Sequence, residues 1–239
     1  MEHQTPNAQK QTVLITGAGG AMAEAVNAAF DEAGWKLALF GHSEGDLQRL
    51  RARYPDALVY AVDLTDEAAT RTFIEEVHRQ AGSIDAVLNI AGGFAMQPAD
   101  KATREDYERL FARNFITLFN TTRAVLPIMK AQGSGFILGV SAAAAEGGGG
   151  GMSLYAASKA AVTAYLKSLH AELADDGLRV STLYPMGTVD TPANRTSMPD
   201  ADPSAWIAPS ELAESMLYLA SRSRQGHIRE LKVYAPGSD

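Results

Sequence analysis

Two side chains in the second half of the chain are suited to moving a proton. Tyr155 and Lys159 lie four residues apart in SLYAASK, which has helical character, so they would share one helix face. A phenol has a pKa of about 10, too high for ready proton exchange at neutral pH, and a nearby ammonium group lowers it. The pair therefore predicts a general acid. The alternative is a surface contact without a catalytic role.

The stretch before this pair raises the question of a hydroxyl partner. Residues 139–151 read GVSAAAAEGGGGG, in which Ser141 carries the hydroxyl. A hydroxyl beside the acid would help to hold a developing alkoxide. Ser141 is therefore a candidate catalytic residue.

Short apolar runs alternate with amphipathic stretches that must position these residues. Strands are predicted at 12–16, 36–41, 57–62, 86–89, 135–140, 179–184 and 228–234, and helices near 22–33, 44–53, 66–80, 103–131, 153–175 and 209–222. The alternation predicts one α/β domain over residues 1–239, a Rossmann-like doubly wound parallel sheet of about seven strands with helices on both faces. Ligands of such sheets bind beyond the carboxyl ends of the strands.

Composition restricts the classes of protein and site. No apolar run approaches the roughly 18 residues of a membrane span. A net charge of −7 argues against a nucleic-acid partner. Cysteine is absent and the five histidines show no metal-ligand spacing, so no metal site is expected. The polar start, expected to be flexible over residues 1–11, lacks the apolar stretch of a signal peptide. These features predict a cytoplasmic protein without a membrane partner.

A glycine-rich turn follows the first predicted strand. Residues 16–20 read TGAGG and lead directly into a helix. Small residues let the backbone approach a pyrophosphate, and the helix N-terminus supplies N–H donors and a positive dipole. The alternative is a tight strand-to-helix turn without a ligand. Its place after the first strand of an alternating chain favours dinucleotide binding.

The end of the second predicted strand bears on the choice of cofactor. A carboxylate there binds the ribose hydroxyls of NAD, but this chain has Gly41, followed by His42 and Ser43. Because Gly41 has no side chain, there is no carboxylate at this position to repel the 2′-phosphate of NADP. His42 and Ser43 could donate hydrogen bonds to that phosphate. NADP(H) is therefore favoured, and NAD(H) is possible. Alternatively, Ser43 caps the following helix.

These motifs resemble those of the short-chain dehydrogenase/reductase family, over about residues 12–235. Thr16-Gly17 matches the start of its glycine-rich turn, Asn89-Ile90-Ala91-Gly92 resembles its Asn-Asn-Ala-Gly motif, and Tyr155-x3-Lys159 resembles its active-site pair. Ala21 and Ala23 stand where the family usually has later glycines. The resemblance implies hydride transfer between a nicotinamide dinucleotide and a small-molecule substrate.

The resemblance also implies roles for single residues. Tyr155 would donate a proton as hydride reaches the substrate, Lys159 would also hold the nicotinamide ribose, and Asn114 would position a water leading to solvent. Asp63 would meet the adenine ring. The residues implied around the cofactor are Gly17, Gly19, Gly20, Ala21, Met22, His42, Ser43, Asp63, Leu64, Asn89, Ala91, Gly92, Tyr155, Lys159, Pro185 and Thr188.

The family's catalytic serine has no clear counterpart. It usually stands thirteen residues before the tyrosine and seven after the glycine that opens the fifth strand. Counting from Tyr155 and from Gly135 leads both times to Ala142. Ser141 would then point to the other face of the sheet, unless a local bulge re-aims its hydroxyl.

A narrower resemblance is carried by residues 185–208, expected to be a substrate loop. DTPANRTSMPDAD at 190–202, followed by Trp206, resembles the loop of dihydropteridine reductases. That group also has alanine at the serine position. The resemblance implies hydride transfer to a conjugated acceptor, with Phe94, Met186 and Trp206 at the substrate. The alternative is a proline-stiffened surface loop.

Two other functions remain open. One is a reductase of ketones, quinones or 3-oxoacyl substrates. The other is a dinucleotide-binding sensor without catalysis. The family resemblance further implies a homodimer or a homotetramer.

Overall fold

The computed structural model describes residues 10–237, and within them seven parallel strands form one sheet in the order β3-β2-β1-β4-β5-β6-β7. The strands are β1 (Thr12–Thr16), β2 (Lys36–Gly41), β3 (Leu58–Ala61), β4 (Ala86–Asn89), β5 (Gly135–Val140), β6 (Leu178–Met186) and β7 (Glu230–Tyr234). The chain builds outward from β1 to β3 and then returns to β4 beside β1. Ligands of such sheets bind at this reversal. The predicted flexible segment 1–11 falls mostly on residues 1–9, which lie outside the described residues.

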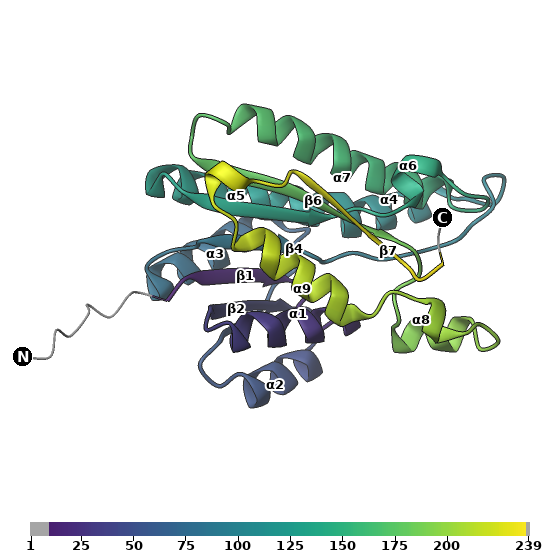
Figure 1. Cartoon of the computed structure of the whole chain (residues 1–239), viewed down its shortest axis with the longest axis horizontal. Coiled ribbons are helices and arrows are strands. Elements are labelled where there is room, and N and C mark those ends of the chain that lie inside the picture. The colour runs from purple at the N-terminus through teal and green to yellow at the C-terminus, as the bar shows by residue number, and fades with distance from the viewer. Residues whose placement is uncertain (1–9, 238–239) are drawn as a thin grey trace, which may run out of the picture.

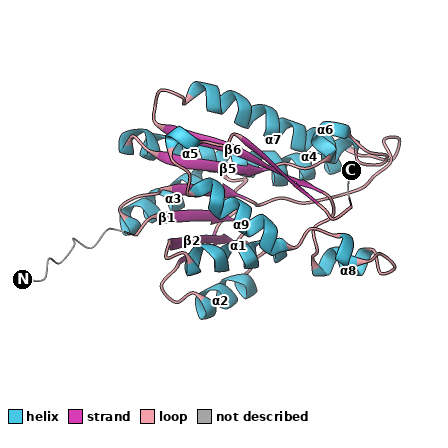
Figure 2. Cartoon of the chain, in the orientation of Figure 1, coloured by secondary structure: helices cyan, strands magenta, loops and turns pink. Residues whose placement is uncertain are grey.

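Helices cover both faces of the sheet (Figures 1 and 2). One face carries α1 (Ala21–Glu32), α2 (Glu44–Arg53) and α9 (Pro209–Ala220). The other carries α3 (Glu67–Ala81), α5 (Thr117–Gln132) and α7 (Ser153–Glu172). The Rossmann-like single domain that the sequence predicts is confirmed.

The alternation of side chains along β1 shows why two cores form. Val13 and Ile15 belong to the core with Phe30 of α1, whereas Leu14 belongs to the core with Ile74 of α3. Successive side chains of a strand point to opposite faces, so the middle of a strand buried on both sides is a continuous apolar run, here Val13 to Ile15. All five residues of β1 are buried.

The helix predicted over 103–131 has an interruption. It consists of α4 (Arg104–Phe111), a π-helical turn η1 (Ala112–Ile116) and α5. Because a π turn inserts an extra residue into the helix, it rotates the side chains that follow. The apolar periodicity does not reveal this turn, which contains Asn114.

Short helices also form in segments that show no helical period in the sequence. These are α6 (Ala144–Gly147), α8 (Pro192–Ser197) and the 3-10 turns η2 (Pro203–Ala205) and η3 (Arg224–Gly226). For α8, the Thr191 hydroxyl accepts a hydrogen bond from the Asn194 N–H at 3.3 Å, and Pro192 is the first helical residue. Helices of one or two turns are too short to show a 3.6-residue period.

Candidate active site

Tyr155 and Lys159 lie on the first turns of α7, beside the end of β5. The Lys159 ammonium is buried and donates a hydrogen bond to the Val140 carbonyl at 2.8 Å. Burial lowers the pKa of Lys159 to about 8. Burial raises the pKa of Tyr155 to about 12, which is opposite to the lowering expected from the nearby ammonium, so the phenol keeps its proton at neutral pH. A protonated phenol is the form that can act as an acid.

Asn114 joins this pair from the π-helical turn. Its side-chain oxygen accepts from the Gly93 N–H at 2.7 Å, and its amide donates to the Gly93 carbonyl at 3.0 Å and to the Ser158 hydroxyl at 2.9 Å. A Cβ added at Gly92 would lie 2.9 Å from the Asn114 oxygen and 3.5 Å from Lys159 Nζ. Asn114 and Lys159 therefore converge on the backbone that follows β4, where only glycine leaves room.

Ser141 is directed away from this cluster. Its hydroxyl lies 2.8 Å from the Thr163 hydroxyl and donates to the Lys159 carbonyl at 3.3 Å, and the side chain is buried. Both partners belong to α7. The Ser141 side chain therefore points into the interior of the domain, as the alternation of side chains along an extended chain predicts. Its neighbour Ala142 has no hydroxyl.

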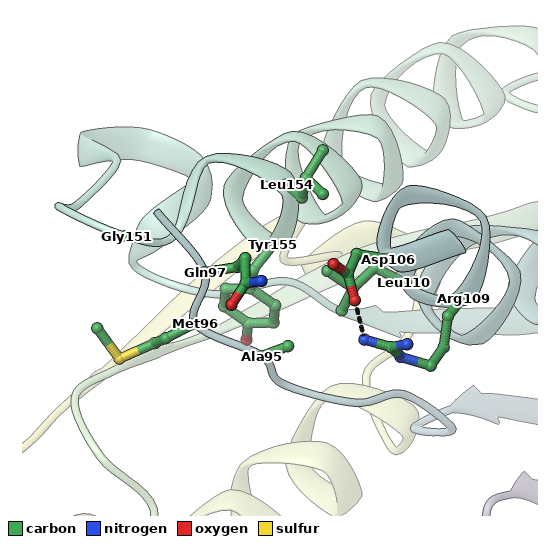
Figure 3. Close-up of a pocket in the computed structure, with 9 residues that line it drawn as sticks. All are labelled: Ala95, Met96, Gln97, Asp106, Arg109, Leu110, Gly151, Leu154 and Tyr155. Atoms are coloured by element: carbon green, nitrogen blue, oxygen red, sulfur yellow. Dashed lines mark hydrogen bonds and ion pairs between the residues drawn. The ribbon is translucent and has the colours of Figure 1, made fainter. Parts of the chain in front are cut away.

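A small cavity of about 50 Å³ adjoins Tyr155 (Figure 3). Its walls are the segment after β4, the start of α7 and one side of α4. The lining residues are Ala95, Met96, Gln97, Asp106, Arg109, Leu110, Gly151, Leu154 and Tyr155. The Gln97 N–H donates to the Gly151 carbonyl at 2.7 Å, which joins the glycine run before α7 to this wall.

The predicted substrate residues differ in their relation to this cavity. The Phe94 ring contacts the Tyr155 ring edge-on, with the ring centres 4.9 Å apart. None of the three predicted substrate residues, Phe94, Met186 and Trp206, is itself among the residues that line the cavity. Met96 and Arg109 do line it, although neither was predicted from the sequence. The position of Met96, two residues after Phe94 in the segment following β4, is a signal that could have found it.

The ends of β1 and β4 form the dinucleotide side of the site. The Thr16 hydroxyl accepts from the N–H groups of Ile90 and Ala91, each at 3.1 Å. Gly17 has φ +65°, and a Cβ there would lie 2.8 Å from the Ala91 Cα. The buried side-chain oxygen of Asn89 has no hydrogen-bond partner among residues 10–237. A cradle that excludes side chains and a free buried acceptor both fit a bound dinucleotide.

Comparison with known proteins agrees with this geometry. The profile of the short chain dehydrogenase family matches residues 11–202. The chain belongs to this family. It is 27% identical over 222 residues to an uncharacterised oxidoreductase of Staphylococcus aureus (strain MRSA252), covering 92% of this chain and 95% of the relative.

Two solved structures extend the comparison. A 3-ketoacyl-(acyl-carrier-protein) reductase from Brucella melitensis complexed with NADH is 26% identical, with a TM-score of 0.84 and coverage of 95% of this chain and 97% of that chain. A closed form of serine dehydrogenase complexed with NADP+ has a TM-score of 0.86, with coverage of 93% and 94%. At 24% identity, the latter likeness shows the fold alone. This short-chain dehydrogenase is an NAD(P)-dependent oxidoreductase. The alternative of a dinucleotide-binding sensor without catalysis is therefore excluded.

Other predicted cofactor residues of this short-chain dehydrogenase lie at strand ends. Asp63, after β3, accepts hydrogen bonds from the hydroxyl of Thr65 at 2.6 Å and from its N–H at 2.9 Å, and these bonds lower the pKa of its carboxyl. The amide of Asn120 donates to the Leu64 carbonyl at 3.0 Å and so ties this loop to α5. A contact between Asp63 and adenine stays a prediction.

The ends of β2 and β6 carry the remaining predicted residues. His42 and Ser43 are exposed, and Ser43 caps α2 by accepting from the Asp46 N–H at 3.2 Å. The alternative that Ser43 is a helix cap is therefore confirmed. At the end of β6, the Pro185 carbonyl accepts from the Ala143 N–H at 3.2 Å, and the Thr188 carbonyl accepts from the Ile207 N–H at 2.8 Å.

Among residues 10–237, no helix is both long enough and apolar enough to cross a membrane.

Proposed function

We propose that this enzyme uses NAD(P)H to reduce a small conjugated acceptor, with an activity like that of dihydropteridine reductases. The proposal rests on the end of β5, where Ala142 offers no hydroxyl and the Ser141 hydroxyl is bound to Thr163. A localised alkoxide formed from a ketone needs such a donor. A conjugated, nitrogen-rich ring spreads the developing charge over several atoms and needs it less.

The chain's own residues account for the proton. When bound, NAD(P)H supplies the hydride. Tyr155 holds a proton at its phenolic oxygen, because burial keeps its pKa high, and would donate that proton to the acceptor. The ammonium of Lys159 then stabilises the phenolate. Asn114 fixes the backbone at Gly93 and, through Ser158, the start of α7.

The surroundings of Tyr155 favour a flat acceptor. Phe94 and Met96 are 58% and 59% exposed although both are large and apolar. Phe94 contacts the Tyr155 ring, and Met96 lines the cavity beside Tyr155. Aromatic rings favour stacked or edge-to-face partners, so an exposed Phe94 can hold a planar ring.

A second candidate is a 3-oxoacyl reductase. It is supported by the likeness to the Brucella melitensis 3-ketoacyl reductase, at 26% identity. The two candidates differ in the chemistry at Ala142, because a 3-oxoacyl substrate yields a localised alkoxide and a dihydropterin does not.

A substrate panel tests the proposal. The purified protein is assayed with a quinonoid dihydropterin, a quinone, a 3-oxoacyl thioester and a simple ketone, each with NADH and with NADPH. The proposal expects the highest kcat/KM for one of the conjugated acceptors. A higher value for the 3-oxoacyl thioester would favour the second candidate and contradict the first.

We also propose that residues 185–208 cover the substrate. This segment begins at the end of β6 and includes α8, which lies beyond the carboxyl ends of the strands (Figure 1). A bridge between Val189 and Ile207 closes it at its base. Trp206→Ala should raise KM for the acceptor more than it lowers kcat, and an unchanged KM would argue against this role.

A homodimer or homotetramer is the expected assembly. Phe115, Phe119 and Tyr165 form a half-buried aromatic group on η1, α5 and α7, with centroids of the Phe115 and Tyr165 rings 5.7 Å apart. Leu118, Val162 and Leu169 on the same helices are core residues. Sedimentation as a monomer at micromolar concentration would contradict this assembly.

A further inference from the structure

We propose that Asp46, on the first turn of α2, takes the place of the strand-end carboxylate that binds the adenosine ribose, and that Arg49 is the cation which admits a 2′-phosphate. Cofactor choice would then depend on an aspartate–arginine pair of α2 and not on Gly41. This inference concerns the dinucleotide and is independent of the proposed acceptor.

The position of Asp46 is the first reason. A Cβ built on Gly41 would lie 3.7 Å from the Cβ of Asp46. A Cβ built on Gly19 would lie 2.5 Å from the Asp46 Cγ and 2.9 Å from its Oδ2. The carboxylate therefore fills the space between the end of β2 and the glycine-rich turn. A ribose carboxylate acts in this space.

The charge of Asp46 is the second reason. A hydrogen bond from the Ser43 hydroxyl lowers the pKa of the Asp46 carboxyl most, and the Ser43 backbone and Arg49 lower it further. The carboxylate is thus ionised at neutral pH and can accept hydrogen bonds from ribose hydroxyls. Ser43, predicted to donate to a 2′-phosphate, instead faces a negative charge.

The third reason is the cavity beside the pair. Asp46 and Arg49 line a cavity of about 410 Å³ together with Gly19 and Gly20 of the glycine-rich turn. Arg49 forms an ion pair with Asp46, and its side chain is 69% exposed against 21% for the aspartate. An exposed guanidinium can turn toward a phosphate, which it binds with two hydrogen bonds. Asp46, the less exposed member of the pair, stays in place for the ribose.

The experiment measures cofactor binding without any acceptor. Dissociation constants of NADH and NADPH are determined by fluorescence titration for wild type, Asp46→Asn and Arg49→Gln. Thermal shifts with ADP and with adenosine 2′,5′-bisphosphate, which lack the nicotinamide, provide a second readout. Glu44→Gln and Arg51→Gln are the matched controls, because both residues belong to α2 and neither is among the residues lining the cavity.

Opposite shifts are expected from the two substitutions. Asp46→Asn should change the ratio of the two dissociation constants in favour of NADPH by at least about tenfold, and Arg49→Gln should change it in favour of NADH. The controls should stay within about twofold. A folded Asp46→Asn variant with an unchanged ratio would overturn the proposal. If that variant does not fold, Asp46→Ser carries the same expectation and Arg49→Gln decides independently. Failure of the dihydropterin assay would leave these binding results unaffected.

Discussion

Two strand ends of this protein carry a small residue without a polar side chain, beside a neighbour that has one. At the end of β2, Gly41 stands in place of a carboxylate, and the Asp46 side chain lies in the adjoining space against Gly19. After the end of β5, Ala142 offers no hydroxyl, and the hydroxyl of its neighbour Ser141 lies 2.8 Å from that of Thr163. At the end of β2 a neighbouring carboxylate can replace the missing one. After β5 the nearest hydroxyl points away from the position where one is missing.

The difference follows from how each strand continues. After β2, helix α2 begins at Glu44 and its first turn returns over the strand end, where Gly19 leaves room for a side chain. After β5, the main helix α7 begins only at Ser153. Adjacent residues of an extended chain point to opposite faces, so Ser141 cannot act for Ala142 without a change of backbone. A missing group can thus be replaced where a neighbouring helix folds back onto the strand end.

The largest expected effect tests whether the end of β5 is a catalytic centre. Tyr155→Phe removes the phenolic proton and should lower kcat by at least about 100-fold. The dissociation constant of NAD(P)H should change little. Tyr165→Phe, on the same helix, is the control and should retain activity. Near-normal turnover by Tyr155→Phe would remove Tyr155 from the mechanism.

The next effect is the pH dependence of stability that the buried Lys159 ammonium causes at the end of β5. Burial lowers the pKa of Lys159 to about 8, below its ordinary 10.5. Between these values the unfolded chain binds a proton that the folded protein does not, so the free energy of unfolding rises with pH. Between pH 7 and pH 9.5 the free energy of unfolding of the wild type should therefore rise by about 2 kcal/mol relative to that of Lys159→Met.

Urea unfolding of both cofactor-free proteins at the two pH values measures this difference. A difference that does not change with pH would mean that Lys159 has an ordinary pKa in the folded protein.

Ala142→Ser addresses the missing hydroxyl itself. The added oxygen supplies a donor to a localised alkoxide, so kcat/KM for a simple ketone should rise by at least about tenfold relative to that for a dihydropterin or a quinone. Ser141→Ala is the matched control and should change the rates for both substrates little. Loss of ketone reduction in Ser141→Ala would show that Ser141, and not position 142, provides the catalytic hydroxyl.

The smallest expected effect is at the other strand end. Gly41→Asp should change the ratio of NADH to NADPH dissociation constants by less than about threefold, because Asp46 already provides a carboxylate there. The new Cβ would also lie 3.1 Å from Leu47 Cδ2. In an Asp46→Asn background the same substitution should favour NADH more strongly. A large swing toward NADH in the single variant would mean that Asp46 does not reach the ribose.

Several features were predictable because they depend on local sequence. Apolar runs marked the strands, with β1 found at Thr12–Thr16 as expected and β6 extending beyond the predicted 179–184 to Met186. The four-residue spacing of Tyr155 and Lys159 places both on one side of α7 in any regular helix. The glycine-rich turn was predicted to bring the backbone close to a pyrophosphate, which stays a prediction; the structure shows that Gly17 has φ +65° and lies against Ala91.

What the sequence determined by itself is the order of the elements, the sheet they form and the residues that stand at its carboxyl edge. Strand and helix periodicities and glycine-rich turns are properties of neighbouring residues, so they can be read along the chain. Only the tertiary structure decided that Asn114 lies in a π-helical turn beside Gly93, that the Ser141 hydroxyl is bound to Thr163, and that Asp46 lies against Gly19. These contacts join segments that are distant in sequence. Their geometry depends on how helices pack on the sheet, which local periodicity does not specify.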